Sequence, residues 1–439
     1  MGSSSSKSAY SANNSHGASI AAYELASALT DTLSEIDLNG SLNEQLKQLL
    51  QRLDQESANY TNSKVNDDEA TEWNPPQTEV QLISAAWRCA RGTYNVEDTI
   101  ADTSYCTFHR SQVTDSSFAG TVKLITSTVV QTVTDEGTSD LLPVLVLAIR
   151  GSASKMDHIV NANAQPKPTE GFIQHAEGLK AHSGFLNSAR ALDSIVTGLI
   201  KKYLEDFDKS NGRKPHVVFT GHSAGGAVSQ LLYLRHISDQ DWRQSARFSC
   251  ITFGAPPCLT GPVDLSFCQP SSRTFCVNII NEFDVVTRAD KPYILSLVDL
   301  ARAMLNLPPK TQISELETNE EIVNASLKAT KDNESMLSDN SHDIDGKDNQ
   351  VWRFPQALYH HVGSRVVLLM RFVQGQMNLK AVEVTPSEFQ KLLFCRVTVH
   401  GKRRYEERVA VLEEGHFNGR LGWLDADNKH KTPSQEDSL

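Results

Sequence analysis

Residues 216–226 read His-Val-Val-Phe-Thr-Gly-His-Ser-Ala-Gly-Gly. The apolar run 217–219 predicts a short buried strand, and 227–234 predicts a helix. Between them lies a G-x-S-x-G pattern, which in a strand–turn–helix context is typical of a nucleophile elbow. The turn is too tight for side chains at positions 221 and 225, and both are Gly. Ser223 is therefore our candidate nucleophile, the alternative being a Gly-rich turn that only joins strand to helix.

On both sides of this elbow, strand patterns alternate with helix patterns. We expect helices over 80–91, 186–207 and 224–236, and strands over 108–110, 121–130, 141–149, 216–220, 248–253, 275–280 and 366–372. Further strands are expected between 379 and 413. The run 141–149 is apolar throughout, as in a strand buried on both faces. The pattern predicts an α/β fold with a mostly parallel central sheet flanked by helices.

The remaining segments predict the domain organisation. Residues 1–76 are expected to form an N-terminal extension with a disordered tail, a helical hairpin over 20–54 and a linker ending at Pro75 and Pro76. The hairpin would pack on the main domain or on a protein partner. The catalytic domain is expected over 77–425, with a disordered acidic insertion at 310–350. Residues 426–439 are expected to be a disordered tail.

Charge and cysteine content limit the environment and the partners. The net charge of −11 argues against nucleic acid as a partner. The seven cysteines show no C-x-x-C pattern and no dense spacing, which predicts free thiols in a reducing, cytoplasmic compartment. The first six residues, Met-Gly-Ser-Ser-Ser-Ser, match the N-myristoylation pattern at Gly2. The alternative is a Ser-rich disordered tail without a lipid, which would have the same sequence. One acyl chain would give reversible membrane contact.

A serine nucleophile needs an acid and a histidine, which in this architecture follow it in that order. Asp284 comes directly after the expected strand 275–280, at the sheet edge where such sites form. Asp290 and Asp264 are weaker candidates.

The histidine is harder to choose from position alone. Those that follow Asp284 in the chain are His342, His360, His361, His400 and His416. The first lies in the acidic insertion, and the last two lie in the region expected to be terminal strands. His360 and His361 precede a strand on a loop, and from position they are equal candidates.

An acyl-transfer site also needs donors for the developing oxyanion. The backbone N–H of Ala224 follows the nucleophile, and Ser152 follows the run 141–149 through Gly151. Both are our candidates for the oxyanion hole. The alternative for 151–152 is an ordinary Gly/Ser turn.

Six segments in order resemble the fungal-type class 3 lipase family. They are 146–152 (Val-Leu-Ala-Ile-Arg-Gly-Ser), 182–185 (His-Ser-Gly-Phe), the elbow 221–225, 252–256 (Thr-Phe-Gly-Ala-Pro), 281–284 (Asn-Glu-Phe-Asp) and 361–363 (His-Val-Gly). The resemblance implies an α/β-hydrolase fold and hydrolysis of lipid acyl esters without a metal or cofactor. It implies Ser223 as nucleophile, Asp284 as acid and, in preference to His360, His361 as base. Ser152 and Ala224 would form the oxyanion hole.

Two other functions stay open at this point. One is an esterase or acyltransferase that acts on a non-lipid acyl ester. The other is a membrane-associated protein that binds lipid with little catalysis and recruits a partner through its N-terminal helices. The resemblance also implies a lid after Ser152, and the mostly polar residues 161–171 predict weak activation by lipid surfaces.

Overall fold

The computed structural model describes residues 42–115, 124–133, 141–151, 165–174, 176–207, 213–265, 275–306, 351–373 and 375–423. Several sequence-based expectations lie outside these residues. They are Gly2, the N-terminal tail, the first half of the helical hairpin, Ser152 with the start of the lid, the 310–350 insertion and the C-terminal tail. Among the described residues, no helix is both long and apolar enough to span a bilayer.

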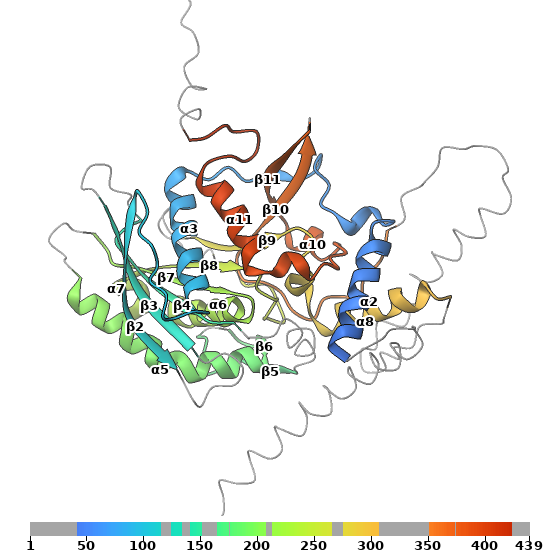
Figure 1. The fold of residues 1–439 in the computed structure, drawn as a ribbon. Helices are drawn as coiled ribbons and strands as arrows, with labels where there is room; N and C mark the ends of the chain where they lie inside the picture. Colours follow the sequence, from blue (N-terminus) through green and yellow to red (C-terminus); the bar gives the residue numbers. More distant parts are fainter. Residues whose placement is uncertain are drawn as a thin grey trace, which may run out of the picture.

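The described part of the chain folds around a mixed nine-stranded sheet, with strand order β1-β11-β10-β9-β8-β7-β4-β3-β2 (Figure 1). The five central strands β10, β9, β8, β7 and β4 run parallel, and the strands on either side are antiparallel. The strands are β1 (Thr71–Glu72), β2 (Cys106–Asp115), β3 (Leu124–Thr132), β4 (Val144–Ile149), β7 (His216–His222), β8 (Arg247–Phe253), β9 (Cys276–Asn281), β10 (Ser364–Val373) and β11 (Gln376–Val384). A separate small hairpin pairs β5 (Pro166–Pro168) with β6 (Lys180–His182). The parallel core confirms the predicted α/β fold, an α/β-hydrolase sheet with antiparallel edges.

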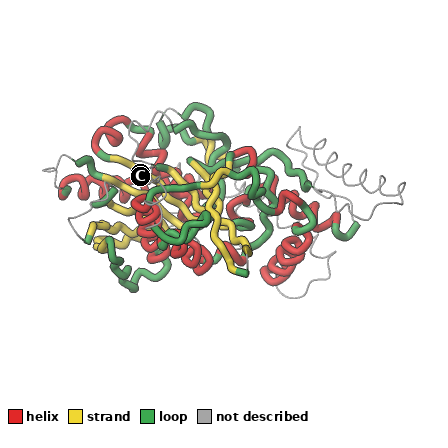
Figure 2. Tube along the Cα trace, turned by 90° about the horizontal axis from the view of Figure 1, so that it is seen from above, coloured by secondary structure: helices red, strands yellow, loops and turns green. Residues whose placement is uncertain are grey.

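Helices cover both faces of this sheet, as the view from above shows (Figure 2). Helices α5 (Ser183–Asp206) and α6 (Ala224–Ile237) share one core with Leu145, Leu147 and Ile149 of β4. Helices α3 (Gln77–Gly92) and α11 (Lys402–Glu413) share the other core with the alternate residues of β4. Successive strand residues point to opposite faces, so an entirely apolar strand supplies both cores at once.

The N-terminal extension packs on the body. Helix α2 (Leu42–Ser57) contacts α8 (Lys291–Ala303) at one end of the molecule (Figure 1). Its buried residues Leu49, Leu50 and Leu53 join the apolar cluster of α8. These three leucines of the expected hairpin are therefore buried against the body of the same chain. The expected linker over 55–76 is wrong, because Tyr60 and Val65 are buried and β1 adds to the sheet.

The segment 379–413 differs from the sequence-based expectation. Only β11 is a strand there; it is followed by the short helix α10 (Pro386–Phe389), the 3-10 helix η4 (Thr398–His400) and α11. Tyr405, Val409 and Leu412 of α11 are buried at i, i+4 and i+7, which is the spacing of one helix face. Of the charged residues between them, Glu407 is exposed, whereas Arg408 is partly buried and donates to the Leu368 oxygen at 2.7 Å. The change places His400 on a turn directly before a helix.

Candidate active site

The G-x-S-x-G turn forms the predicted elbow between β7 and α6. Ser223 has φ 62° and ψ −134°, a strained conformation for a residue with a side chain. A Cβ on Gly221 would lie 2.4 Å from the carbonyl carbon of Gly225, and one on Gly225 would lie 2.1 Å from the oxygen of Ile149. Only glycine fits at either position. The Ser223 N–H donates to the Phe253 oxygen at 2.9 Å, which ties the turn to β8.

Ser223 is hydrogen-bonded to a histidine that is itself hydrogen-bonded to a carboxylate. The Ser223 Oγ lies 2.7 Å from His400 Nε2, and His400 Nδ1 lies 2.8 Å from Asp284 Oδ2. All three residues are at most 2% exposed. A carboxylate only accepts, so Nδ1 carries the proton and Nε2 is left to accept the proton of the serine hydroxyl. This is the arrangement of a nucleophile, a general base and an orienting acid.

The structure corrects the predicted histidine, because His361 does not contact Ser223. Its Nε2 donates to the Ala255 oxygen at 3.0 Å, and it is 7% exposed. Burial, with a smaller contribution from Arg365, lowers its pKa to about 3, so the ring is uncharged at neutral pH. The neighbouring candidate His360 binds the side chain of Gln390 through its Nδ1, 2.9 Å away. Neither is placed to take a proton from the serine.

His400 could have been found from one signal in the sequence. It lies in Val399-His400-Gly401, directly before the amphipathic helix α11. A helix over 402–413 places His400 on the turn before it, where a catalytic histidine can reach the sheet edge. The strands expected between 379 and 413 instead place His400 inside a strand region.

The Asp284 carboxylate has two donors besides His400. The Tyr405 hydroxyl donates to Oδ2 at 2.7 Å, and the Val286 N–H donates to Oδ1 at 3.0 Å. Burial raises the pKa of Tyr405 well above its usual value, with a further contribution from Asp284, so the phenol stays protonated. The rival carboxylate Asp290 instead caps α8, accepting from the N–H of Tyr293 at 3.0 Å.

A second histidine, His222, packs against His400 and is hydrogen-bonded to its backbone. The ring of His222 stacks on that of His400, with centroids 4.8 Å apart, and its Nε2 donates to the His400 oxygen at 3.0 Å. Because Nε2 holds the proton, Nδ1 accepts from the Tyr94 hydroxyl at 3.1 Å. The Asn281 side-chain amide donates to the Val399 oxygen at 2.9 Å, which joins the acid strand to the histidine turn. Sequence analysis missed Tyr94, His222, Asn281 and Tyr405 in these roles.

Gly151, which precedes the predicted oxyanion donor Ser152 in the chain, lies beside the nucleophile. A Cβ on Gly151 would lie 2.5 Å from the Tyr94 hydroxyl and 3.3 Å from the Cβ of Ser223, so glycine permits this close approach. Ala224, the first residue of α6, is buried directly after Ser223. The predicted donor Ser152 follows Gly151 but lies outside the described residues.

Next to the site lies a hollow of about 740 Å³ between α3, α11 and the loop that joins α3 to β2. Trp87 and Tyr94 line it, and both rings contact His222. The Lys402 ammonium lies 4.0 Å from the centre of the Tyr94 ring. Among the described residues, no group of His, Cys, Asp or Glu side chains is arranged to hold a metal ion. The six described cysteines are buried free thiols.

The sheet and the site define the class of protein: an α/β-hydrolase with a serine nucleophile. Residues 146–293 match the family model described as Lipase (class 3). In this segment the chain is similar to the class 3 lipases, and the protein is a carboxylic ester hydrolase. The match includes the elbow and Asp284 and ends before His400.

Solved structures of lipases match the chain at low sequence identity. The Rhizomucor miehei lipase propeptide complex is 14% identical, covering 74% of this chain and 80% of that chain, with a TM-score of 0.42. A Rhizopus microsporus var. chinensis lipase is 16% identical, covering 52% and 74%, with a TM-score of 0.37. A triacylglycerol lipase described with a serine protease triad is 14% identical, covering 77% and 94%, with a TM-score of 0.41. No curated protein sequence matches the chain.

Proposed function

We propose that this protein hydrolyses acyl esters of lipids, such as an acylglycerol or a phospholipid, with Ser223, His400 and Asp284 as its catalytic residues. The observation that carries the proposal is the 2.7 Å contact between the Ser223 Oγ and His400 Nε2, with the Nδ1 proton already directed at Asp284. A protein that only bound lipid would need neither the strained serine nor an oriented histidine.

The geometry gives a two-stage reaction. His400 takes the Ser223 proton as the oxygen attacks the ester carbonyl, and the oxyanion is stabilised by the Ala224 N–H and, we propose, by Ser152. His400 then protonates the leaving alcohol as the tetrahedral intermediate collapses to the acyl-enzyme. A water molecule, deprotonated by the same histidine, releases the fatty acid and restores Ser223. Asp284 stabilises the imidazolium through its hydrogen bond to Nδ1.

One feature of the surface supports a lipid as the substrate. The β10–β11 hairpin exposes Phe372 by 72% and Met377 by 58%. Strand β10 runs parallel to β9 and continues five residues past Leu368, the partner of Asn281. The hairpin tip therefore projects roughly 17 Å beyond the sheet edge that carries the site.

The proposal includes the cellular setting. An apolar hairpin tip together with an acyl chain on Gly2 would supply the two signals that membrane contact requires. Buried free thiols suit a reducing compartment, and we propose a cytoplasmic protein in reversible contact with a membrane.

Active-site labelling with ester hydrolysis tests the proposal. Wild-type protein should react with a fluorophosphonate probe and hydrolyse p-nitrophenyl esters, with a preference for long acyl chains. Ser223→Ala should abolish both while the unfolding temperature stays close to that of wild type. A preference for acetate or butyrate esters would favour a non-lipid esterase, and the absence of labelling in folded wild-type protein would contradict the proposal.

A further inference from the structure

The N-terminal extension contacts the two segments that carry Asp284 and His400. These segments lie next to each other, because Asp284 pairs with Arg396 in an isolated parallel bridge and the Arg396 N–H donates to the Phe283 oxygen at 2.9 Å. His400 lies one turn after Arg396. The relative position of acid and histidine therefore depends on how residues 282–284 and 396–400 are held.

The first contact is made by Asp54 at the end of α2. The Arg396 Nε lies 3.1 Å and 2.8 Å from the two carboxylate oxygens of Asp54. The same guanidinium lies over the Phe283 ring, 4.4 Å from its centre. Phe283 has φ 74°, a strained conformation for an aromatic residue, directly before Asp284. Asp54 thus holds the side chain that covers this strained residue.

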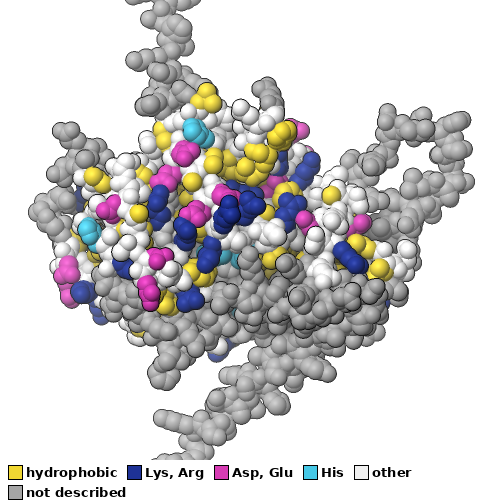
Figure 3. All heavy atoms as spheres, in the orientation of Figure 1, with side chains coloured by type: hydrophobic (Ala, Val, Ile, Leu, Met, Phe, Trp, Pro, Cys, Tyr) yellow, Lys and Arg dark blue, Asp and Glu magenta, His cyan; other side chains and the backbone are white. Residues whose placement is uncertain are grey.

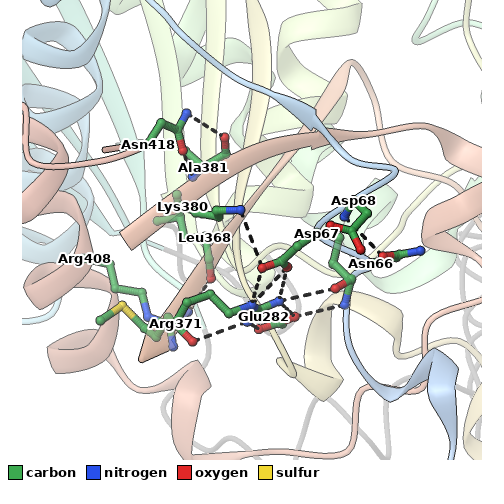
Figure 4. Close-up of polar contacts among 12 residues, drawn as sticks. Asn66, Asp67, Asp68, Glu282, Leu368, Arg371, Lys380, Ala381, Arg408 and Asn418 are labelled. Carbon is green, nitrogen blue, oxygen red and sulfur yellow. Dashed lines mark hydrogen bonds and ion pairs between the residues drawn. The ribbon is translucent and has the colours of Figure 1, made fainter. Parts of the chain in front are cut away.

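The second contact is made by Asp67, through Arg371 of β10 (Figure 4). Arg371 Nη2 lies 2.9 Å from Oε1 of Glu282 and 2.8 Å from Oδ1 of Asp67, and its Nε lies 2.9 Å from the other Asp67 oxygen. Glu282 is fully buried, two residues before Asp284, and also accepts the Val65 N–H at 2.9 Å. The Arg371 guanidinium therefore binds both Asp67 of the N-terminal extension and Glu282 of the segment that carries Asp284.

Charge pairing explains why these groups stay fixed. A buried carboxylate is strongly unfavourable unless it is paired and hydrogen-bonded, and Glu282 meets both conditions through Arg371 and Val65. Burial works to lower the pKa of Arg371, but the hydrogen bonds to Glu282 and Asp67 outweigh it and raise the pKa above its usual value. The guanidinium is therefore charged at neutral pH.

We infer that Asp54 and Asp67 are positioning residues for catalysis: the N-terminal extension holds the acid and histidine segments in register through Arg396 and Arg371. This inference rests on the proposed function and assigns the extension a part in it. Catalysis tolerates little misplacement of the reacting groups, since a shift of about 1 Å can cost on the order of a hundredfold in rate. Binding of a small ester does not depend on that alignment.

Kinetics of the Asp54→Asn, Asp67→Asn and double variants test the inference in the full chain. With p-nitrophenyl butyrate, the double variant should lose about tenfold in kcat with little change in KM, and each single variant should lose less. Asp54→Glu and Asp67→Glu, which keep the charge, should recover most of the rate. The matched control is Asp193→Asn, which removes an ion pair to Arg235 of similar exposure between α5 and α6. Its kcat should equal that of wild type.

Two results would overturn the inference, and they are distinguishable from failure of the proposed function. One is a double variant with a lowered unfolding temperature but a wild-type kcat, which would make the contacts purely structural. The other is an equal loss of kcat in Asp193→Asn. A wild-type protein that neither labels with fluorophosphonate nor turns over the ester would overturn the proposed function, and this inference with it.

Discussion

The carboxylate of Asp284 receives three hydrogen bonds while fully buried, from His400 Nδ1, the Tyr405 hydroxyl and the Val286 N–H. Each donor restricts the direction in which the carboxylate faces the imidazole. The Tyr405 hydroxyl also accepts the Asn281 N–H at 3.1 Å, so it connects the acid to the strand before it. At the scale of single residues, the site is an ordered network in which the acid is held from three sides.

Replacement of Tyr405 by Phe tests this network. The ring would keep its packing against Trp87 and His222, while Asp284 would lose one donor of three. We expect kcat for a soluble ester to fall about fivefold to tenfold, the equivalent of roughly 1 kcal/mol for one buried hydrogen bond, with KM unchanged. A kcat equal to that of wild type would show that the phenol does not orient the acid.

Single residues also show which parts of the site can be predicted from the sequence and which cannot. Ser223, Gly221 and Gly225 are adjacent in sequence and share one turn, so a local pattern identifies the elbow. Ser223 and His400 are 177 residues apart, and their contact depends on the packing of α11. His361 satisfied the resemblance but is a buried, uncharged side chain that donates to Ala255. No local pattern distinguishes the two histidines.

At the scale of elements, the junction of β4, β7 and α6 is the most tightly packed part of the site. The backbone of Gly225 lies against the last residue of β4 and against Gly151. This close approach brings Gly151 next to the nucleophile. The apolar strands and the elbow helix follow predicted patterns closely, whereas α11 does not, because its short, highly charged sequence has only three buried residues.

Gly225→Ala should separate these elements. The new methyl group would lie 2.1 Å from the Ile149 oxygen, so β4 and α6 would have to move apart. We expect the free energy of unfolding to fall by about 2–4 kcal/mol, with loss of activity. Gly198→Ala is the control, since a methyl group added to this exposed helical glycine would meet no heavy atom within 4 Å. It should raise stability by roughly 0.5–1 kcal/mol. Urea unfolding that gave equal values for both variants would contradict the account.

At the scale of the whole molecule, buried histidines make folding sensitive to acid. Burial lowers the pKa of His216 and His236 to about 4 and that of His361 to about 3. In the unfolded chain each titrates near 6.5. The unfolded state therefore binds more protons as the pH falls below about 6.5, so stability is fully present above that value and is lost towards pH 4 to 3.

Urea unfolding between pH 7.5 and 4.5 measures this effect. The free energy of unfolding should be nearly constant down to about pH 6.5 and then fall, by up to about 1.4 kcal/mol per pH unit for each histidine. His361→Gln should make the fall shallower, because one of the three groups no longer titrates. A free energy that stayed constant to pH 4.5 would contradict the burial of these rings.

Charge and apolar groups are also unevenly distributed over the surface. Lys and Arg side chains gather over α3 and α11, and apolar side chains gather at the β10–β11 hairpin, on the face that Figure 3 shows. Phe372 and Met377 are cross-strand partners at the tip of that hairpin. Exposed apolar side chains of this kind are typical of contact sites, and the membrane contact proposed above would use them.

Vesicle sedimentation tests this contact. Phe372→Ser with Met377→Ser should reduce binding to phosphatidylcholine vesicles by at least about a hundredfold, because about 3–6 kcal/mol of apolar burial is removed when two large side chains are replaced. Hydrolysis of p-nitrophenyl butyrate in solution should be unaffected. Val133→Ser is the control, since Val133 is 47% exposed at the end of β3, away from the catalytic edge. Equal vesicle binding by all three proteins would exclude the hairpin as an anchor.

The most direct test of the central claim compares His400→Gln with His361→Gln in fluorophosphonate labelling and ester turnover. We predict that His400→Gln loses at least about a thousandfold in kcat and labels barely at all, because the general base is gone. His361→Gln should label at close to the wild-type rate. Loss of activity in His361→Gln, with labelling retained in His400→Gln, would contradict the site described here.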